Sequence, residues 1–156
     1  MACELRIAGI EPESVVDGEG IRYVVFVQGC PHRCPGCHNP ETHPFDGGRV
    51  ADIQELFEEI RENPLLKGVT FSGGEPFCQP KPLAELARLV HGIGKDVTTY
   101  TGYLYEELLN MQDPDVVDLL AQTDTLIDGP FILAERDLTL PFRGSRNQRI
   151  IQLTGK

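Results

Sequence analysis

The sequence contains no tryptophan, no long apolar run and few basic residues. Its longest unbroken apolar stretch is Tyr23–Val27, whereas a membrane-spanning helix needs about 18 apolar residues. The chain does not open on the charged-then-apolar pattern of a secretory leader. Only 14 Lys and Arg stand against 24 Asp and Glu, so the formal net charge is −10, and a nucleic-acid surface needs clustered basic residues. We therefore expect a cytosolic protein that binds neither nucleic acid nor a membrane.

Length and cysteine number limit the architecture further. The chain has 156 residues and 40% hydrophobic content, which suits one compact domain over residues 1–156. Five cysteines are an odd number, and three of them lie within eight positions, at Cys30, Cys34 and Cys37. This clustering disfavours a disulfide framework and, in a reducing compartment, points to metal binding or catalysis.

Strand and helix patterns alternate along the chain. Apolar runs predict strands near residues 5–10, 21–29, 68–76, 96–102, 124–129 and 149–153. Helical spacing of apolar residues predicts helices over residues 50–63, 83–93, 103–110 and 113–122. Asp52 lies near the start of the first, and Asp113 is a candidate cap of the last. The repeated order of strand and helix predicts an α/β fold with a mostly parallel sheet. Ligands of such sheets bind at the carboxyl ends of the strands.

The three clustered cysteines follow the spacing C-x3-C-x2-C directly after the predicted strand 21–29. Thiolates suit zinc or iron-sulfur clusters. A structural zinc site needs a fourth protein ligand, for which His32, His38 and His43 are candidates. A four-iron cluster held by three cysteines would instead keep one iron open for another ligand. Local evidence leaves zinc and a cluster equally open.

A second motif, "SGGEP" at residues 72–76, ends the next predicted strand. Gly73 and Gly74 lack a Cβ, so the backbone there can approach a small molecule closely. Glu75 can add a charged acceptor. The segment alone fits an ordinary turn, but a parallel sheet would bring it beside the cysteine loop.

Together, the two motifs resemble those of the radical S-adenosylmethionine enzymes. "DGEGIRYVVFVQGCPHRCPGCHNPET" is similar to the glycyl-radical activating enzymes within that superfamily. "TYTGY", "LIDGPF" and "FRGSRNQRI" resemble the branch that activates the anaerobic ribonucleoside-triphosphate reductase. Most of the superfamily has an aromatic residue before the third cysteine, where this chain has Gly36.

The resemblance implies a minimal, laterally open partial (β/α) barrel. It implies one 4Fe-4S cluster on Cys30, Cys34 and Cys37, and S-adenosylmethionine bound by two segments, Gly36–His38 and Gly73–Glu75. Reductive cleavage of S-adenosylmethionine would yield a 5'-deoxyadenosyl radical, which takes a hydrogen atom from a glycine of the reductase. A flavodoxin-like protein would donate the electron. The cofactor supplies the hard chemistry, so we expect no general acid or base.

Two other functions remain open. One is a zinc-binding interaction module completed by His38 or His32, and the other is an activase of another glycyl-radical enzyme, such as pyruvate formate-lyase. Outside the cysteine loop, we expect Cys3 and Cys78 to be small buried residues. The sequence leaves open whether four polar residues near its end make turns or contact a ligand: Asp128, Arg143, Ser145 and Asn147.

Overall fold

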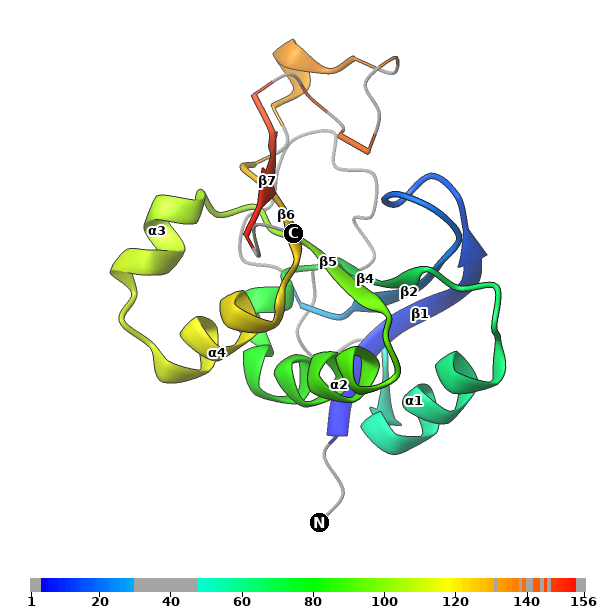
Figure 1. The fold of residues 1–156 in the computed structure, drawn as a ribbon. Coiled ribbons are helices and arrows are strands. Elements are labelled where there is room, and N and C mark those ends of the chain that lie inside the picture. The colour runs from blue at the N-terminus through cyan, green and yellow to red at the C-terminus, as the bar shows by residue number, and fades with distance from the viewer. Residues whose placement is uncertain are drawn as a thin grey trace.

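A seven-stranded sheet forms the centre of the computed structural model (Figure 1). The structure describes residues 4–29, 48–130, 132–137, 139, 142–143, 145 and 147–153. The strands lie in the order β3-β1-β2-β4-β5-β6-β7. Their bounds are β1 (Glu4–Ser14), β2 (Arg22–Val27), β3 (Arg49–Asp52), β4 (Gly68–Gly73), β5 (Asp96–Tyr100), β6 (Thr125–Asp128) and β7 (Arg149–Gln152).

The centre of the sheet is parallel and its margins are antiparallel. Strand β4 pairs in parallel with β2 and β5, and β5 pairs in parallel with β6. Strand β1 runs antiparallel to both β2 and β3, and β7 runs antiparallel to β6. The predicted open, mostly parallel α/β sheet is confirmed, and the carboxyl ends of β2, β4, β5 and β6 share one edge. We call this edge the carboxyl edge.

Polar N-cap side chains bind the first turns of two of the helices. The helices are α1 (Ile53–Glu62), α2 (Pro80–Gly92), α3 (Tyr105–Asn110) and α4 (Pro114–Gln122), with short 3-10 turns η2 (Pro76–Cys78) and η3 (Leu133–Glu135). The Asp52 carboxylate accepts a 2.8 Å hydrogen bond from the Gln54 N–H, and Asp113 caps α4 in the same way through the Asp115 N–H, at 2.9 Å. The predicted cap at Asp113 is confirmed, and Asp52, expected near the start of the first helix, caps α1.

The two faces of the sheet differ in chemistry. Helices α1, α2 and α4 lie on one side of it (Figure 1), where Val69, Phe71, Val97 and Leu126 are fully buried in the core. Because side chains alternate along a strand, the residues between them point to the other face. This face, which we call the inner face, carries Arg22, Thr70 and Thr98, all nearly or fully buried.

Arg22 lies on the inner face at the amino ends of the parallel strands, where it binds groups from three parts of the chain. Its guanidinium donates to the Thr70 hydroxyl at 2.7 Å and to the Glu19 carbonyl at 2.9 Å. It also lies 2.6 Å from a carboxylate oxygen of Asp96. A buried arginine needs such partners, and here they join the loop after β1 to strands β4 and β5.

Two element predictions were wrong in detail. Residues 50–52 were predicted as the start of a helix, but they belong to the edge strand β3, and α1 begins at Ile53. Strand β1 continues past residue 10 to Ser14, because its second half pairs with β2 across register shifts. Pairing partners that are distant in sequence decide both features, and the local pattern does not show them.

Candidate functional site

The Gly-Gly-Glu turn is tied to the end of β2 at the carboxyl edge. Val27 and Gly73 are paired neighbours in the sheet. The Gly74 N–H donates to the Val27 carbonyl at 2.8 Å, and the Glu75 N–H donates to the Gly29 carbonyl at 2.7 Å. The residue before Cys30 is therefore hydrogen-bonded to the turn that follows β4.

The predicted metal and adenosyl-binding residues of the loop itself lie outside the described residues. These are Cys30, Cys34, Gly36, Cys37 and His38. The candidate zinc ligands His32 and His43 also lie there. In the described part of the chain, no group of three or more His, Cys, Asp or Glu side chains is arranged to hold a metal ion.

Gly73 makes close contact between β4 and β2 possible. Its φ is +93°, a region that residues with a Cβ rarely adopt. A Cβ at this position would lie 2.7 Å from the Val27 nitrogen and 2.8 Å from the Phe26 Cα. Glycine is thus required here by the packing of the two strands as well as by the backbone conformation.

The Glu75 carboxylate is fully buried and bound by protein donors. One oxygen accepts from the Gly102 N–H at 2.8 Å. The other accepts from the Phe77 N–H at 3.0 Å and from the Thr101 hydroxyl at 2.8 Å. Such bonds satisfy a buried charge. The sequence analysis did not identify Thr101 or Gly102, although their place at the end of β5, next to β4, is a signal that could have revealed them.

Asp128 joins β6, β7 and α3 at the same edge. Its carboxylate is fully buried, accepts from the Tyr105 N–H at 2.8 Å and pairs with the Arg149 guanidinium through both oxygens. Arg149 also bonds Glu106 at 2.8 Å. Hydrogen bonds to Asp128 and Glu106 raise the pKa of Arg149, and its hydrogen bond lowers the pKa of Glu106.

The segment before β7 makes hydrogen bonds to the inner face of the sheet and among its own residues. The Tyr100 hydroxyl donates to the Phe142 carbonyl at 2.6 Å. Asn147 donates to the Pro130 carbonyl at 2.8 Å, and the Ser145 hydroxyl donates to the Asn147 side-chain oxygen. Arg143 donates to the Gln148 carbonyl at 3.3 Å. Arg143, Ser145 and Asn147, whose roles the sequence left open, therefore all make hydrogen bonds to groups in this part of the chain.

A pocket of about 290 Å³ opens on the inner face. Arg22, Thr98 and Ile127 contribute strand residues to its wall, and Phe142 and Ile150 contribute apolar surface from the last part of the chain. Asp96 and Thr125, the first residues of β5 and β6, also line it, so it lies toward the amino ends of these strands.

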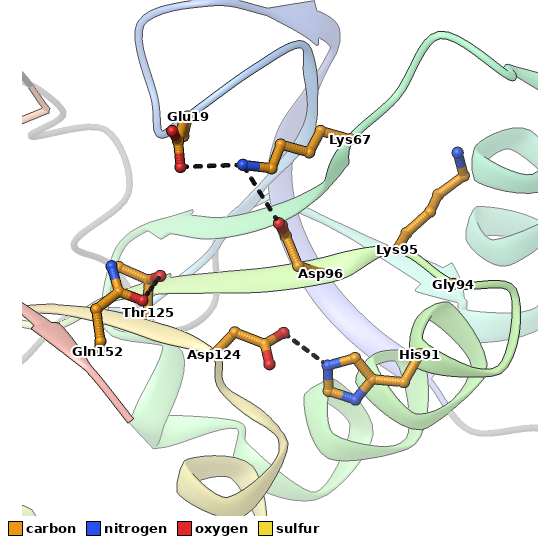
Figure 2. Close-up of a pocket in the computed structure, with 9 residues that line it drawn as sticks. All are labelled: Glu19, Lys67, His91, Gly94, Lys95, Asp96, Asp124, Thr125 and Gln152. Atoms are coloured by element: carbon orange, nitrogen blue, oxygen red, sulfur yellow. Dashed lines mark hydrogen bonds and ion pairs between the residues drawn. The ribbon is translucent and has the colours of Figure 1, made fainter. Parts of the chain in front are cut away.

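A larger pocket, of about 490 Å³, lies at the amino edge of the sheet, opposite the carboxyl edge (Figure 2). Lys67 bridges Glu19 and Asp96 there, at 2.9 and 3.9 Å. The His91 Nε2 lies 2.8 Å from Asp124, which also accepts from the Val97 N–H. These polar groups bind one another across the amino edge, so the carboxyl edge is the better candidate site.

The two cysteines outside the cysteine loop, Cys3 and Cys78, were expected to be buried. Cys78 is exposed, so its predicted burial is wrong. It lies at the end of η2, where Pro76 and Phe77 point into the protein instead. Cys3 lies outside the described residues.

No helix in the described part of the chain combines the length and apolar character needed to cross a membrane.

Comparison with known proteins identifies relatives over most of the chain. Residues 16–151 match the family model described as a 4Fe-4S single cluster domain. The chain is 34% identical over 151 residues to the anaerobic ribonucleoside-triphosphate reductase-activating protein of Escherichia coli K12, covering 91% of this chain and 95% of that protein. The protein of the same name from Haemophilus influenzae is 35% identical over 148 residues, covering 89% and 92% of the two chains.

Two further matches cover shorter parts of the chain. The pyruvate formate-lyase-activating enzyme of Clostridium pasteurianum is 42% identical over 124 residues, which are 73% of this chain and 52% of that enzyme. Among solved structures, QueE from Escherichia coli matches with a TM-score of 0.50 at 20% identity, over 64% of this chain and 52% of QueE. That likeness concerns the fold alone. The match to the family model shows that this chain belongs to the 4Fe-4S single-cluster family. The identity to relatives along nearly their whole length shows that it belongs to the family of anaerobic ribonucleoside-triphosphate reductase-activating proteins.

Proposed function

We propose that this protein is a radical S-adenosylmethionine activase that generates a glycyl radical on an anaerobic ribonucleoside-triphosphate reductase. The observation that carries the proposal is the 34% identity to the Escherichia coli activating protein, which extends over 91% of this chain. The similarity is therefore not confined to the cysteine motif. It includes the strands and turns that form the carboxyl edge.

The donor set of the cysteine loop fits a 4Fe-4S cluster. Three thiolates at Cys30, Cys34 and Cys37 are soft ligands that such clusters prefer. The loop starts directly after Gly29, whose carbonyl is bound by Glu75. The bound groups would supply a one-electron cleavage of S-adenosylmethionine and abstraction of a hydrogen atom from the α-carbon of a glycine in the partner.

The chain's own residues bind and orient these groups. In this proposal the backbone of Gly73 and Gly74 presents polar groups to the amino-acid end of S-adenosylmethionine, with Glu75 completing this segment. Gly36, Cys37 and His38 line its adenosyl part. No described side chain is assigned a proton-transfer role, because the reaction needs orientation and exclusion of water rather than an acid or base.

The inner face offers a route for the partner. A glycine in a large protein must reach the carboxyl edge as part of an extended loop. The 290 Å³ pocket between β5, β6 and the Phe142 region supplies both apolar and polar wall on the inner face, toward the amino ends of these strands. We assign this surface to the reductase segment that carries the target glycine, and we assign the electron supply to a flavodoxin-like one-electron donor.

Metal and sulfide analysis tests the proposal against a zinc module. Anaerobically reconstituted protein should hold about four irons and four acid-labile sulfides, and the reduced protein should cleave S-adenosylmethionine. Replacing Cys30, Cys34 or Cys37 by Ala should abolish cluster and cleavage together. Zinc without sulfide, or cleavage retained in one of these variants, would contradict the proposal.

A specific observation favours a second target. Over 124 residues the chain is 42% identical to a pyruvate formate-lyase-activating enzyme, a higher identity over a shorter stretch than the reductase activases show. The same chemistry directed at another glycyl-radical enzyme is therefore the alternative, and the choice of target protein distinguishes the two.

A further inference from the structure

The Glu75 side chain points into the protein, although its turn is the candidate cofactor-binding segment. The residue is fully buried, and both carboxylate oxygens accept hydrogen bonds from protein groups. The backbone N–H of Glu75 is bound to Gly29. One residue thus connects the end of β2, through its backbone, with the end of β5, through its side chain.

Thr101, the residue directly after β5, supplies one of the hydrogen bonds between this strand's end and the Glu75 side chain. It is 5% exposed, and its own N–H donates to the Ile127 carbonyl at 2.9 Å. Its hydroxyl accepts from the Tyr103 N–H at 3.1 Å and donates to Glu75 at 2.8 Å. Because the hydroxyl accepts from an N–H and faces a carboxylate, its single proton is directed to Glu75.

We propose that Thr101 is a positioning residue for S-adenosylmethionine binding, acting through Glu75 on the Gly73–Gly74 backbone. The inference rests on the proposed function. Gly73 and Gly74 have no side chains to fix their peptide groups, so their orientation depends on the residues on either side. Val27 and Gly29 fix the turn on the β2 side, and the bond from Thr101 to the Glu75 carboxylate fixes it on the β5 side.

The hydroxyl group, rather than the volume of the side chain, carries this role. Thr101→Val keeps the shape and removes the donor, which leaves Glu75 with one bond fewer and lets the turn sample other orientations. Hydrogen bonds to charged groups are among the stronger ones in proteins. We expect S-adenosylhomocysteine, which binds without being cleaved, to bind about tenfold more weakly to the oxidised, cluster-loaded variant.

Two matched variants separate positioning from general damage. Thr101→Ser keeps the donor and should bind S-adenosylhomocysteine within about twofold of the unmodified protein. Thr99→Val removes another buried hydroxyl, which bonds Thr123 at 2.9 Å near the helix-covered side of the sheet. This variant should lose thermal stability without a change in affinity beyond about twofold.

The test is equilibrium binding of S-adenosylhomocysteine, combined with hydrogen exchange of the Gly102 amide. That amide donates to Glu75, so it should exchange faster in Thr101→Val and not in Thr99→Val. If Thr101→Val does not fold, Thr101→Ala takes its place, since it also removes the hydroxyl donor. Unchanged affinity, or equal weakening by Thr99→Val, would overturn the inference.

The outcome is distinguishable from failure of the proposed function. If the unmodified protein holds no cluster and binds no S-adenosylhomocysteine, the proposed function fails and this inference fails with it. If the unmodified protein binds the ligand and the Thr101 variants bind it equally well, the positioning role alone is wrong.

Discussion

The backbone N–H of Glu75 donates a 2.7 Å hydrogen bond to the carbonyl of Gly29. This bond joins the Gly-Gly-Glu turn after β4 to the residue that precedes Cys30. The two motifs are 43 positions apart when counted from Cys30 to Gly73, yet parallel pairing of β2 with β4 brings their starting points into contact. A cofactor that binds both motifs therefore meets a turn whose position is set by the sheet.

Replacing Glu75 by Gln should destabilise the protein. The carboxylate offers acceptors to three donors, whereas an amide turns its own NH2 group toward at least one of them. The free energy of unfolding should fall by about 2–3 kcal/mol, measured by denaturant unfolding. Glu107→Gln is the control, because Glu107 is exposed and caps only the Leu104 N–H, so its loss should cost about 1 kcal/mol or less. Equal effects would contradict the account.

Replacing Gly73 by Ala should force β2 and β4 apart. The new Cβ would meet the backbone of Val27 and Phe26 at less than 3 Å, and φ would remain at an unfavourable positive value. We expect a loss of at least about 2 kcal/mol. Gly92→Ala at the end of α2, where a Cβ meets nothing within 4 Å, should be neutral or stabilising by up to about 1 kcal/mol. Thermal unfolding of both variants checks the contrast, and a stable Gly73→Ala would refute it.

Replacing Arg149 by Ala should weaken the attachment of β7. Asp128 would stay buried but lose its bidentate partner, at a cost of about 1–3 kcal/mol. Arg88→Ala removes a surface cation from Glu85 and Asp118, and should cost less than about 1 kcal/mol. The comparison is made by urea unfolding, and it fails if the two variants lose the same stability.

Tyr100 should make stability sensitive to alkaline pH. Burial, with a smaller contribution from Asp17, raises the pKa of the Tyr100 hydroxyl. The folded protein therefore keeps this hydroxyl neutral at a pH where it ionises in the unfolded chain, above about pH 10. The stabilisation is complete below that pH and declines as pH rises above it. Tyr100→Phe loses the bond to Phe142, but its stability should fall less steeply between pH 9 and about pH 11. Urea unfolding at several pH values measures this slope, and an unchanged slope would argue against the assignment.

Local patterns predict most of the fold because each element carries its own signal. The caps at Asp52 and Asp113 and the apolar spacing of α1, α2 and α4 follow from residues close in sequence. Strand β3 and the second half of β1 depend on each other and on β2, so their residues alone do not reveal them. Antiparallel pairing at both margins is likewise a property of the whole sheet.

The candidate site, like the fold, is predictable from local sequence only in part. The positions of Gly73, Gly74 and Glu75 at the carboxyl edge follow from their place after an apolar run, and the structure confirms this location. The binding roles predicted for them stay predictions. The partners of Glu75 on β5's end come from a segment 26 and 27 residues away, and no local pattern in either segment identifies the other. The cysteine ligands are read from spacing alone and lie outside the described residues.

Electron paramagnetic resonance of the target protein tests the central claim most directly. The reduced, cluster-loaded protein is incubated anaerobically with S-adenosylmethionine and either anaerobic ribonucleoside-triphosphate reductase or pyruvate formate-lyase. The account predicts a glycyl-radical signal on the reductase that requires S-adenosylmethionine and disappears when Cys30, Cys34 or Cys37 is replaced by Ala. A signal on pyruvate formate-lyase alone, or on neither protein, would contradict it.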